Sequence, residues 1–418
     1  MISYREAQGI IAEQVHCLPT ESIRSGQALG RVLAEPVTSP INLPSFDNTA
    51  MDGFAIASKG VPVPVGSAWD VLGEQAAGDG ISQATTGCWE IMTGARIPDG
   101  YDAVIPIEQV RITQLHPDGR PARIESTDIA LPGQHVRRTG EDIAHGDIAM
   151  QAGERLAAQH VMLLAGLGIS HVQAIREPRV ALICTGRELV DDVDQVLIEG
   201  QIRNSNGPFL AARLAAAGAR VVHVQTVSDE PEVFIAALNR SLEFVPDIVM
   251  STGAVSMGRY DFVPDTLLRE NAKILFHKVA IRPGKPLLFA RLAGGQLYFG
   301  LPGNPVSSAV GLRFFVETAI RAMTGLLPER SLLVPIKTAM KKKPGFRFHQ
   351  KAGLQVDENG RLFAEVLSGQ ESFRIRPMLQ SNAWVVLPEE AEHISAESLV
   401  EVYGLGHLEF PFSRELSP

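Results

Sequence analysis

The chain has 418 residues, of which 45% are hydrophobic and 20% are charged, and its formal net charge is −9. The length corresponds to about three domains, and the negative charge disfavours nucleic acid and anionic lipid as main partners. The three cysteines, Cys17, Cys88 and Cys184, lie far apart, which argues against a disulfide framework or a zinc ribbon and favours a cytoplasmic location. No apolar run approaches the ~18 residues of a membrane-spanning helix, so we expect no membrane segment.

The first half of the chain predicts a helical start followed by β structure. Residues 1–35 read as helical, because their apolar residues recur at helical spacing, at Ile10, Ile11, Val15 and Leu18. From Ile41 to Pro178, short β-branched runs alternate with Gly, Pro and Asp turns. This pattern predicts mostly β structure, with a helix near Ala157–Leu167.

From Arg179 onward, strands and helices alternate. The strands are RVALIC, RVVHVQTV, DIVMST and QLYFG, and the helices include GPFLAARLAAAG and the long closing segment VSSAVGLRFFVETAIRAMTG. Such alternation over ~150 residues predicts a doubly wound, largely parallel sheet. After Pro328 the chain is again β-rich, which predicts a small C-terminal β-domain that ends near Phe412.

Three glycine-rich segments follow strands of this sheet, where doubly wound proteins bind ligands. They are CTGREL (Cys184–Leu189), STGAVSMGRYDF (Ser251–Phe262) and GLPGNPVS (Gly300–Ser307). Glycine lets backbone N–H groups approach an anion, and a helix that begins after Asn304-Pro305 would direct its N-terminus at the same place. The alternative is that these glycines only make tight turns, which is weaker for three segments at one edge.

The segment HKVAIRPGKP concentrates positive charge in an acidic protein. Lys278 and Arg282 are an even number of residues apart and could share one face of a strand. Pro283-Gly284 then turns the chain so that Lys285 can reach the same crevice. Cations of this kind clamp phosphate and other oxyanions. The alternative is a basic strand edge that prevents edge-to-edge pairing.

Acidic turns could supply a metal site. Asp47 and Asp52 in SFDNTAMDGFAI could ligate magnesium or cap turns, and for this segment alone capping is favoured. GEDIAHGD adds Glu141, Asp142 and Asp147. Mg²⁺ prefers such oxygen ligands. We find no P-loop, Rossmann, nucleophile-elbow or HExxH motif.

Taken together, eight segments in this order resemble the MoeA/gephyrin-E family of molybdenum insertases. They are LPSFDNTAMDGFA, IMTGARIPDGYDAV, RRTGEDI, TGREL, GQIRNSN, STGAVSMGRYDFV, KVAIRPGKPLLF and GLPGNPVSS. The resemblance implies a multidomain fold of α/β and β-rich domains. An elongated N-terminal domain would comprise residues 1–43 and 140–177, and an inserted β-domain residues 44–139. A MogA-like, doubly wound molybdopterin-binding α/β domain would span residues 178–327, and a C-terminal β-barrel residues 328–418.

The resemblance also implies an activity. The family inserts molybdate into adenylylated molybdopterin, with Mg²⁺-assisted release of AMP, as a homodimer whose active clefts are lined by both protomers. The implied partners are a MogA-like molybdopterin adenylyltransferase and the molybdoenzymes or their chaperones, and not nucleic acid or a membrane.

Carried over residue by residue, the family pattern assigns two sets of site residues. The catalytic set, in which Glu188 and Asp261 would also bind the metal, is Asp52, Asp142, Glu188, Asp229, Asp261, Lys278 and Lys285. The set that would bind molybdate or phosphate is Thr93, Ser251, Arg282, Pro286, Asn304, Ser307 and Arg376.

Four residues depart from the family pattern: Arg187, Asn204, Ala254 and Pro377. They leave open the number of magnesium ions and the geometry of molybdate binding. The sequence does not decide between molybdate and tungstate. They also motivate an alternative, a non-catalytic paralogue that binds molybdopterin or delivers the cofactor. A nucleotide pyrophosphatase related to the α/β domain, as in CinA-like proteins, is a third reading. It does not explain the SFDNTAMDGFAI region.

Overall fold

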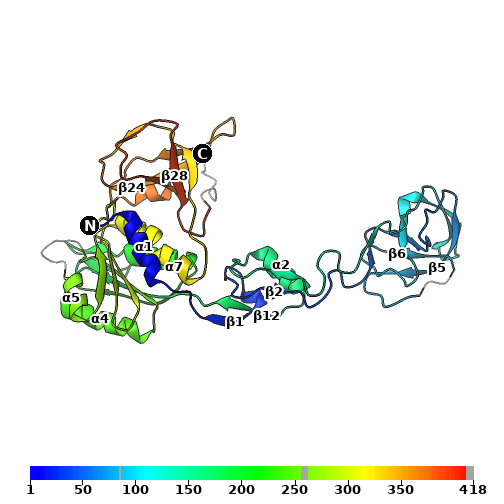
Figure 1. Ribbon diagram of the computed structural model, residues 1–418, viewed down its shortest axis with the longest axis horizontal. Helices are drawn as coiled ribbons and strands as arrows, with labels where there is room; N and C mark the ends of the chain where they lie inside the picture. Colours follow the sequence, from blue (N-terminus) through cyan, green and yellow to red (C-terminus); the bar gives the residue numbers. More distant parts are fainter. Residues whose placement is uncertain (84–85, 256–261, 411–418) are drawn as a thin grey trace. The chain divides into compact units, whose positions relative to one another are not determined.

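The computed structural model describes residues 1–83, 86–255 and 262–410, and the chain divides into two compact units (Figure 1). The first unit comprises Met1–Glu21, Gly30–Val32 and Ala174–Pro418. The second comprises Ser22–Leu29 and Leu33–Gln173. Two of the boundaries between the units lie within the strands β1 (Thr20–Arg24) and β12 (His171–Ile175).

The second unit is mostly β structure, as the turn-rich sequence predicts. Its six-stranded sheet has the order β7-β4-β6-β5-β9-β8. These strands are β4 (Gly53–Ile56), β5 (Ala68–Gln75), β6 (Cys88–Ile91), β7 (Ala103–Pro106), β8 (Val110–Leu115) and β9 (Pro121–Ser126). Two short antiparallel pairs accompany it: β2 (Val37–Thr38) with β11 (Ile148–Met150), and β3 (Asn48–Thr49) with β10 (Val136–Arg137). The expected helix is present as α2 (Ala158–Gly166), and short 3₁₀ turns lie at Ser25–Gln27 and Ile107–Gln109.

The first unit contains the expected doubly wound sheet, in the order β16-β13-β17-β21-β20-β18. Its strands are β13 (Arg179–Thr185), β16 (Arg220–Val227), β17 (Ile248–Thr252), β18 (Lys273–His277), β20 (Leu288–Arg291) and β21 (Leu297–Leu301). The first four strands in this order are parallel, and β20 and β18 complete the sheet as antiparallel neighbours. The prediction of a largely parallel sheet is therefore confirmed. The short strands β14 (Leu189–Val190) and β15 (Ile202–Arg203) pair with each other.

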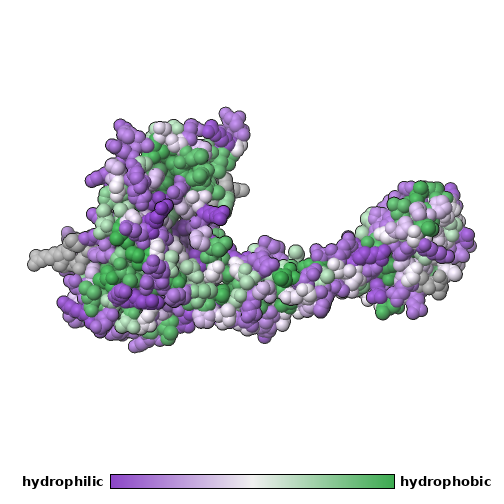
Figure 2. All heavy atoms as spheres, in the orientation of Figure 1, coloured by the Kyte–Doolittle hydropathy of each residue, from purple (hydrophilic) through white to green (hydrophobic). Residues whose placement is uncertain are grey.

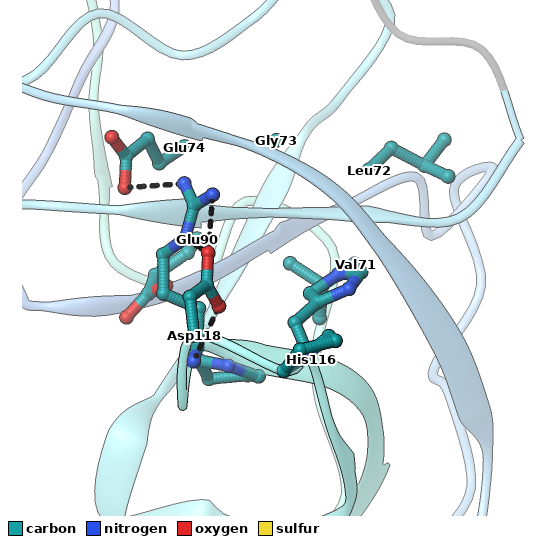
Figure 3. A pocket seen from close by; sticks show the side chains of 10 residues that line it. Val71, Leu72, Gly73, Glu74, Glu90, His116 and Asp118 are labelled. Carbon is teal, nitrogen blue, oxygen red and sulfur yellow. Dashed lines mark hydrogen bonds and ion pairs between the residues drawn. The ribbon is translucent and has the colours of Figure 1, made fainter.

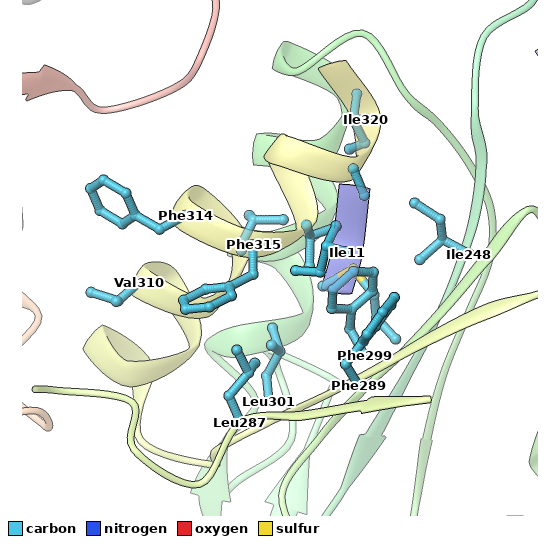
Figure 4. Close-up of a cluster of buried hydrophobic side chains, with 14 of the residues drawn as sticks. Ile11, Ile248, Leu287, Phe289, Phe299, Leu301, Val310, Phe314, Phe315 and Ile320 are labelled. Atoms are coloured by element: carbon cyan, nitrogen blue, oxygen red, sulfur yellow. The ribbon is translucent and has the colours of Figure 1, made fainter. Parts of the chain in front are cut away.

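Helices cover both faces of this sheet. They are α1 (Tyr4–Gln14), α3 (Asn206–Ala216), α4 (Pro231–Glu243), α5 (Val263–Arg269) and the continuous run of α6 (Pro305–Gly311), a π-helical turn (Leu312–Val316) and α7 (Glu317–Met323). Alternate residues of β13 point to opposite faces: Leu182 joins the core under α1, α3 and α7, whereas Ile183 joins the core under α4 and α5. Figure 4 shows the first core, where Ile11, Phe289, Phe299 and Phe315 pack together.

The N-terminal helix is shorter than expected. Ser3 and Glu6 form a capping box that starts α1, with the Ser3 N–H donating to Glu6 Oε2 at 2.7 Å. The helix ends at Gln14, so the prediction of helix as far as residue 35 is wrong. Pro19 cannot continue a helix, and the chain goes on as a strand. Ile11 lies in the α/β core, so α1 belongs to that compact unit, whereas the resemblance implies a domain that joins residues 1–43 to residues 140–177.

A second six-stranded arrangement forms the C-terminal part of the first unit. Its order is β19-β24-β26-β28-β22, with β25 also paired to β24. The strands are β19 (Ile281–Arg282), β22 (Leu332–Pro335), β24 (Arg347–Val356), β25 (Leu362–Val366), β26 (Ala383–Leu387) and β28 (Leu399–Gly404). A 3₁₀ turn, η4 (Arg376–Leu379), precedes β26, and β23 (Met340–Lys341) pairs with β27 (His393–Ile394).

The edge strand β19 comes from HKVAIRPGKP, which overturns one prediction. Lys278 follows the end of β18 and has a φ of +73°, and the chain then leaves the α/β sheet so that Ile281 pairs with Arg347 of β24. Lys278 and Arg282 therefore do not share one strand face, because the backbone changes direction between them.

On the face shown in Figure 2, hydrophobic residues lie in separate patches among hydrophilic ones. Of the helices that the structure describes, none has the length and apolar character needed to cross a bilayer.

A buried ion cluster joins the closing helix of the α/β sheet to the C-terminal sheet. The Arg313 side chain is 4% exposed, and its guanidinium donates to both carboxylate oxygens of Glu329, at 2.8 and 2.6 Å, and to the Gly404 carbonyl at 2.9 Å. Glu317 is fully buried and accepts from the His407 backbone N–H at 2.8 Å. Burial raises the pKa of Glu317 to about 7, against the opposite effect of Arg313.

We expect Arg313→Met to lower the free energy of unfolding by about 3 kcal/mol or more, because it removes the cation bonded to Glu329 and leaves the buried Glu317 with Arg213 but without Arg313. Arg361→Met is the matched control. Its side chain is 60% exposed in a surface pair with Glu397, and it should cost less than about 1 kcal/mol. Urea denaturation of the two variants measures the difference, and equal costs would contradict a stabilising role for the cluster.

Candidate functional site

The three glycine-rich loops meet at one edge of the α/β sheet, as predicted. In the parallel register Cys184 lies beside Thr252, and Thr252 beside Leu301, so β13, β17 and β21 end together. The contact between the loops is close: a Cβ on Gly253, whose φ is +90°, would lie 2.6 Å from Thr185 Oγ1. Only glycine fits at this position. A Cβ on Gly303 would lie 3.7 Å from the Gly253 Cα atom.

The GQIRNSN segment joins the same place through α3. The Asn206 side-chain amide donates to the Gly303 carbonyl at 2.7 Å. Asn204, one of the departures from the family pattern, is 7% exposed, and its amide donates to Asp191 Oδ1 at 2.9 Å. Its oxygen accepts from the Gly207 N–H at the start of α3, also at 2.9 Å. An aspartate at position 204 would place two carboxylates together, so the asparagine suits the acid at position 191. Sequence reasoning missed Asp191, which lies two residues after the end of TGREL.

Predicted acids lie at one end of this edge. Asp229 follows β16, the neighbour of β13, and its Oδ2 is 3.4 Å from the Arg187 backbone N–H. Glu188 is in the same loop, with Oε1 close to Gly186. Asp261 lies outside the described residues. Within the described ranges, no three His, Cys, Asp or Glu side chains are grouped so as to hold a metal ion.

Predicted cations lie at the other end. The loop between β18 and β20 is closed by hydrogen bonds from Lys278 N to Leu287 O, at 2.8 Å, and from Val279 N to Lys285 O, at 3.0 Å. Pro286 is in this loop. Because Leu288 of β20 pairs with Gly300 of β21, β20 begins where β21 ends. Three strand spacings separate β13 from β20, about 14 Å, so acids and cations lie on one edge without direct contact.

Arg282 is directed toward the C-terminal sheet. Its guanidinium lies over the Phe348 ring, 5.5 Å from the centroid. The turn that follows it rests on α6, since a Cβ on Gly284 would be 3.4 Å from the Ser307 carbonyl oxygen. Asn304 is the N-cap residue of α6, and Ser307 is 5% exposed.

Ser251 is buried inside the sheet, whereas a residue that binds a ligand must be accessible to it. It is fully buried, and its hydroxyl is hydrogen-bonded to the Tyr298 hydroxyl inside the sheet. Its side chain is therefore part of the core, and the motif alone gives no sign of this.

A cavity of about 290 Å³ brings together GQIRNSN, GLPGNPVS and ESFRIRPML. Its walls include Asn206 and Phe209 of α3, Pro305 of α6, and Ile375 and Met378 of the C-terminal segment. Neither Glu188 nor Lys285 lines it. Arg376 follows Ile375 directly, at the start of η4.

In the second unit, Asp52 and Thr93 form a pair that the sequence predicts as site residues. The Thr93 backbone N–H and hydroxyl donate to Asp52 Oδ1 at 2.6 and 2.7 Å, and these bonds lower the pKa of the exposed Asp52 carboxyl. Asp142 is also exposed, and its N–H donates to the Leu43 carbonyl at 3.0 Å.

Asp47, the first aspartate of SFDNTAMDGFAI, anchors the RRTGEDI turn. Its carboxylate accepts from the Arg138 guanidinium at 2.6 Å and from the Thr139 N–H at 2.8 Å. Burial raises the pKa of Asp47, but the bonds from Thr139 and Arg138 outweigh burial and lower it. This is the capping role that the sequence favours.

A cavity of about 380 Å³ in the second unit lies apart from all these motifs (Figure 3). Arg120 pairs there with Asp118 at 2.8 Å and with Glu74 at 3.6 Å. Burial and then Glu74 raise the pKa of the neighbouring Glu90. None of the predicted site residues lines this cavity.

The remaining departures have local effects. Ala254 has a φ of +51°, a conformation that costs a residue other than glycine about 1–2 kcal/mol. Pro377 packs against Gly369, 3.0 Å from the position of an added Cβ.

Comparison with known proteins covers nearly the whole chain. Residues 2–168 match the MoeA N-terminal region (domain I and II), residues 181–322 a probable molybdopterin binding domain, and residues 334–405 the MoeA C-terminal region (domain IV). The molybdopterin molybdenumtransferase of Synechococcus elongatus is 34% identical over 97% of this chain and 100% of its own length. That of Haemophilus influenzae is 32% identical over 98% and 100%.

A solved structure has the same architecture. The crystal structure of the molybdopterin biosynthesis MoeA protein from Pyrococcus horikoshii is 27% identical, covers 96% of this chain and 99% of its own, and gives a TM-score of 0.77. The multidomain fold expected from the motifs is confirmed. The chain therefore belongs to the MoeA family, whose curated relatives named here are molybdopterin molybdenumtransferases, and with them to the enzymes of molybdenum cofactor biosynthesis.

Proposed function

We propose that this enzyme inserts molybdate into adenylylated molybdopterin and releases AMP in a Mg²⁺-dependent step. The observation that carries the proposal is the shared edge of the α/β sheet, with Glu188 and Asp229 at one end and the Lys278–Lys285 loop at the other. Strands β13, before Glu188, and β20, after Lys285, lie about 14 Å apart, which suits an extended substrate with a phosphoanhydride near one end and the metal-binding group near the other.

The acids fit a magnesium ion that is shared with the substrate. Mg²⁺ keeps several waters and is commonly held by one or two carboxylates together with substrate phosphates, so a three-ligand protein cage is not required. Glu188, with Asp261, would supply those carboxylates. When bound, the ion neutralises charge that develops on the phosphates. Asp229 holds the Arg187 backbone and so orients the loop that carries Glu188.

The cations fit the oxyanion. Lys285 and Lys278 lie in one closed loop beside the start of α6, where they would attract molybdate into an otherwise acidic protein. Chemistry of this kind depends mainly on positioning and electrostatic stabilisation.

The predicted site residues belong to both units, which supports a homodimer with composite sites. Asp52 and Thr93 are in the second unit, whereas Glu188 and Lys285 are in the first. We propose that one protomer supplies Asp52 and Asp142 to the sheet edge of its partner. The MogA-like adenylyltransferase would supply the substrate, and molybdoenzymes or their chaperones would receive the product.

The direct test is a single-turnover reaction of the purified protein with adenylylated molybdopterin, molybdate and Mg²⁺. Stoichiometric AMP release with cofactor formation is the expected result. Tight binding of molybdopterin without AMP release would instead favour the non-catalytic delivery paralogue.

Lys285→Met and Glu188→Gln should each fold, and each should lower the turnover rate by about 10²–10³-fold, because each removes one protein charge that stabilises the transition state. The two variants should differ in kind: added Mg²⁺ should partly restore Glu188→Gln but not Lys285→Met. Lys341→Met, an exposed lysine on β23, is the control. Wild-type turnover by Lys285→Met or Glu188→Gln would remove that residue from the mechanism.

Mixing two inactive variants tests the composite site. If Asp52→Asn and Lys285→Met dimers are exchanged at equal amounts, half of the dimers are mixed and each mixed dimer has one intact site. About a quarter of wild-type activity should then return. No recovery after proven exchange would place both residues in the site of one protomer.

Thr93→Val should raise the pKa of Asp52 toward its ordinary value, because it removes the hydroxyl donor to the ionised carboxyl. We expect a rise because the hydrogen bonds from Thr93 lower the pKa of Asp52 in the wild-type protein. NMR titration of the Asp52 carboxyl measures it, with Thr113→Val as a control in the same unit. An unchanged pKa would show that the hydroxyl does not stabilise the carboxylate.

A further inference from the structure

A fully buried lysine lies behind the C-terminal segment that borders the 290 Å³ cavity. Lys351 is in the middle of β24, opposite Trp384 of β26, and has no exposed surface. Within the described residues, no carboxylate pairs with its ammonium group. Burial lowers the pKa of Lys351, and Arg374 adds to this effect, against Glu371. A buried ammonium is costly, so its partners indicate what it stabilises.

The ammonium group holds both ends of one short loop. Lys351 Nζ donates to the Gly369 carbonyl at 2.6 Å and to the Arg374 carbonyl at 3.0 Å. These charge-assisted bonds are stronger than bonds between neutral groups. The four residues between them, 370–373, are thereby closed into a small arch.

The backbone of Lys351 also forms hydrogen bonds to the arch. Gln370 Oε1 accepts from the Lys351 N–H at 3.0 Å, and Gln370 Nε2 donates to the Lys351 and Leu367 carbonyls, each at 2.8 Å. The Leu367 N–H also donates to the Lys351 carbonyl at 3.0 Å. The start of the arch is therefore fixed to β24 by both side chain and backbone.

The tip of the arch is hydrogen-bonded to α6, a helix that packs on the α/β sheet. Ser372 O accepts from the Val306 N–H in the first turn of α6, at 3.0 Å. On the far side of the arch, Ile375 lines the cavity and Arg376 begins η4. Because the arch is held at both ends and at its tip, the backbone that leads from it to Arg376 is restrained.

We propose that Lys351 is a positioning residue for molybdate binding, which clamps residues 369–374 against α6 and so fixes Arg376 beside the cavity. The role of Arg376 as a contact to the oxyanion rests on the proposed function. The clamp itself does not, and it can be measured without substrate.

The clamp is tested by limited proteolysis. Arg374, at the second end of the arch, is exposed and is a trypsin site, whereas the Arg376-Pro377 bond resists trypsin. Lys351→Met keeps the length of the side chain but removes both of its charge-assisted bonds. Cleavage after Arg374 should therefore become at least about tenfold faster, since the loss of even one such bond corresponds to about that factor. Mass spectrometry of the fragment that begins at Ile375 gives the rate, and Lys341→Met is the control.

The functional consequence is a change in KM alone. Lys351→Met should raise the KM for molybdate about tenfold and leave kcat within about twofold, because the clamp orders a binding residue and touches no reacting atom. If wild-type protein makes no cofactor, the proposed function fails, while the proteolysis result still decides the clamp.

A merely structural lysine would give a different result. If Lys351→Met fails to fold, Gln370→Leu, which removes the second set of bonds and leaves the buried charge in place, takes the same two measurements. Unchanged cleavage at Arg374, or equal losses in kcat and kcat/KM, would overturn the proposal.

Discussion

The parallel register of β13, β17 and β21 is the constraint on which the site depends. It ends three strands at one level, and the loops that follow are then close enough that a single Cβ on Gly253 would collide with Thr185. The same contact explains why the first turn of α3 meets the loop that leads into α6 there, through the bond from Asn206 to Gly303. The loops are close together because their backbones pack against each other, and the charged side chains surround this contact.

Around that contact the charges are sorted along the sheet edge. The acids follow the parallel strands at one side, and the lysines belong to the antiparallel pair at the other. The cationic loop connects the antiparallel neighbours β18 and β20. It lies at the edge where the parallel strands end, because β20 runs opposite to β21 and β18. From the same loop, β19 crosses into the C-terminal sheet, so the cationic loop and the arch at residues 369–374 are both fixed to β24.

Much of this could be predicted from the sequence because it rests on local patterns. Period-two strands, helical spacing and glycine turns gave the doubly wound sheet and the convergence of its loops. The errors arose where tertiary packing decides. Lys278 takes a positive φ that no spacing rule anticipates, and the hydroxyl of Ser251 points into the sheet. The buried position of Lys351 follows only from the pairing of β24 with β26.

The central claim is that the cationic end of this edge receives the oxyanion. Crystals soaked with molybdate, measured at the molybdenum absorption edge, test it most directly. The account predicts an anomalous peak within contact distance of Lys285, between its loop and the start of α6. A peak at the acidic end, or at the cavity in the second unit with none near Lys285, would contradict it.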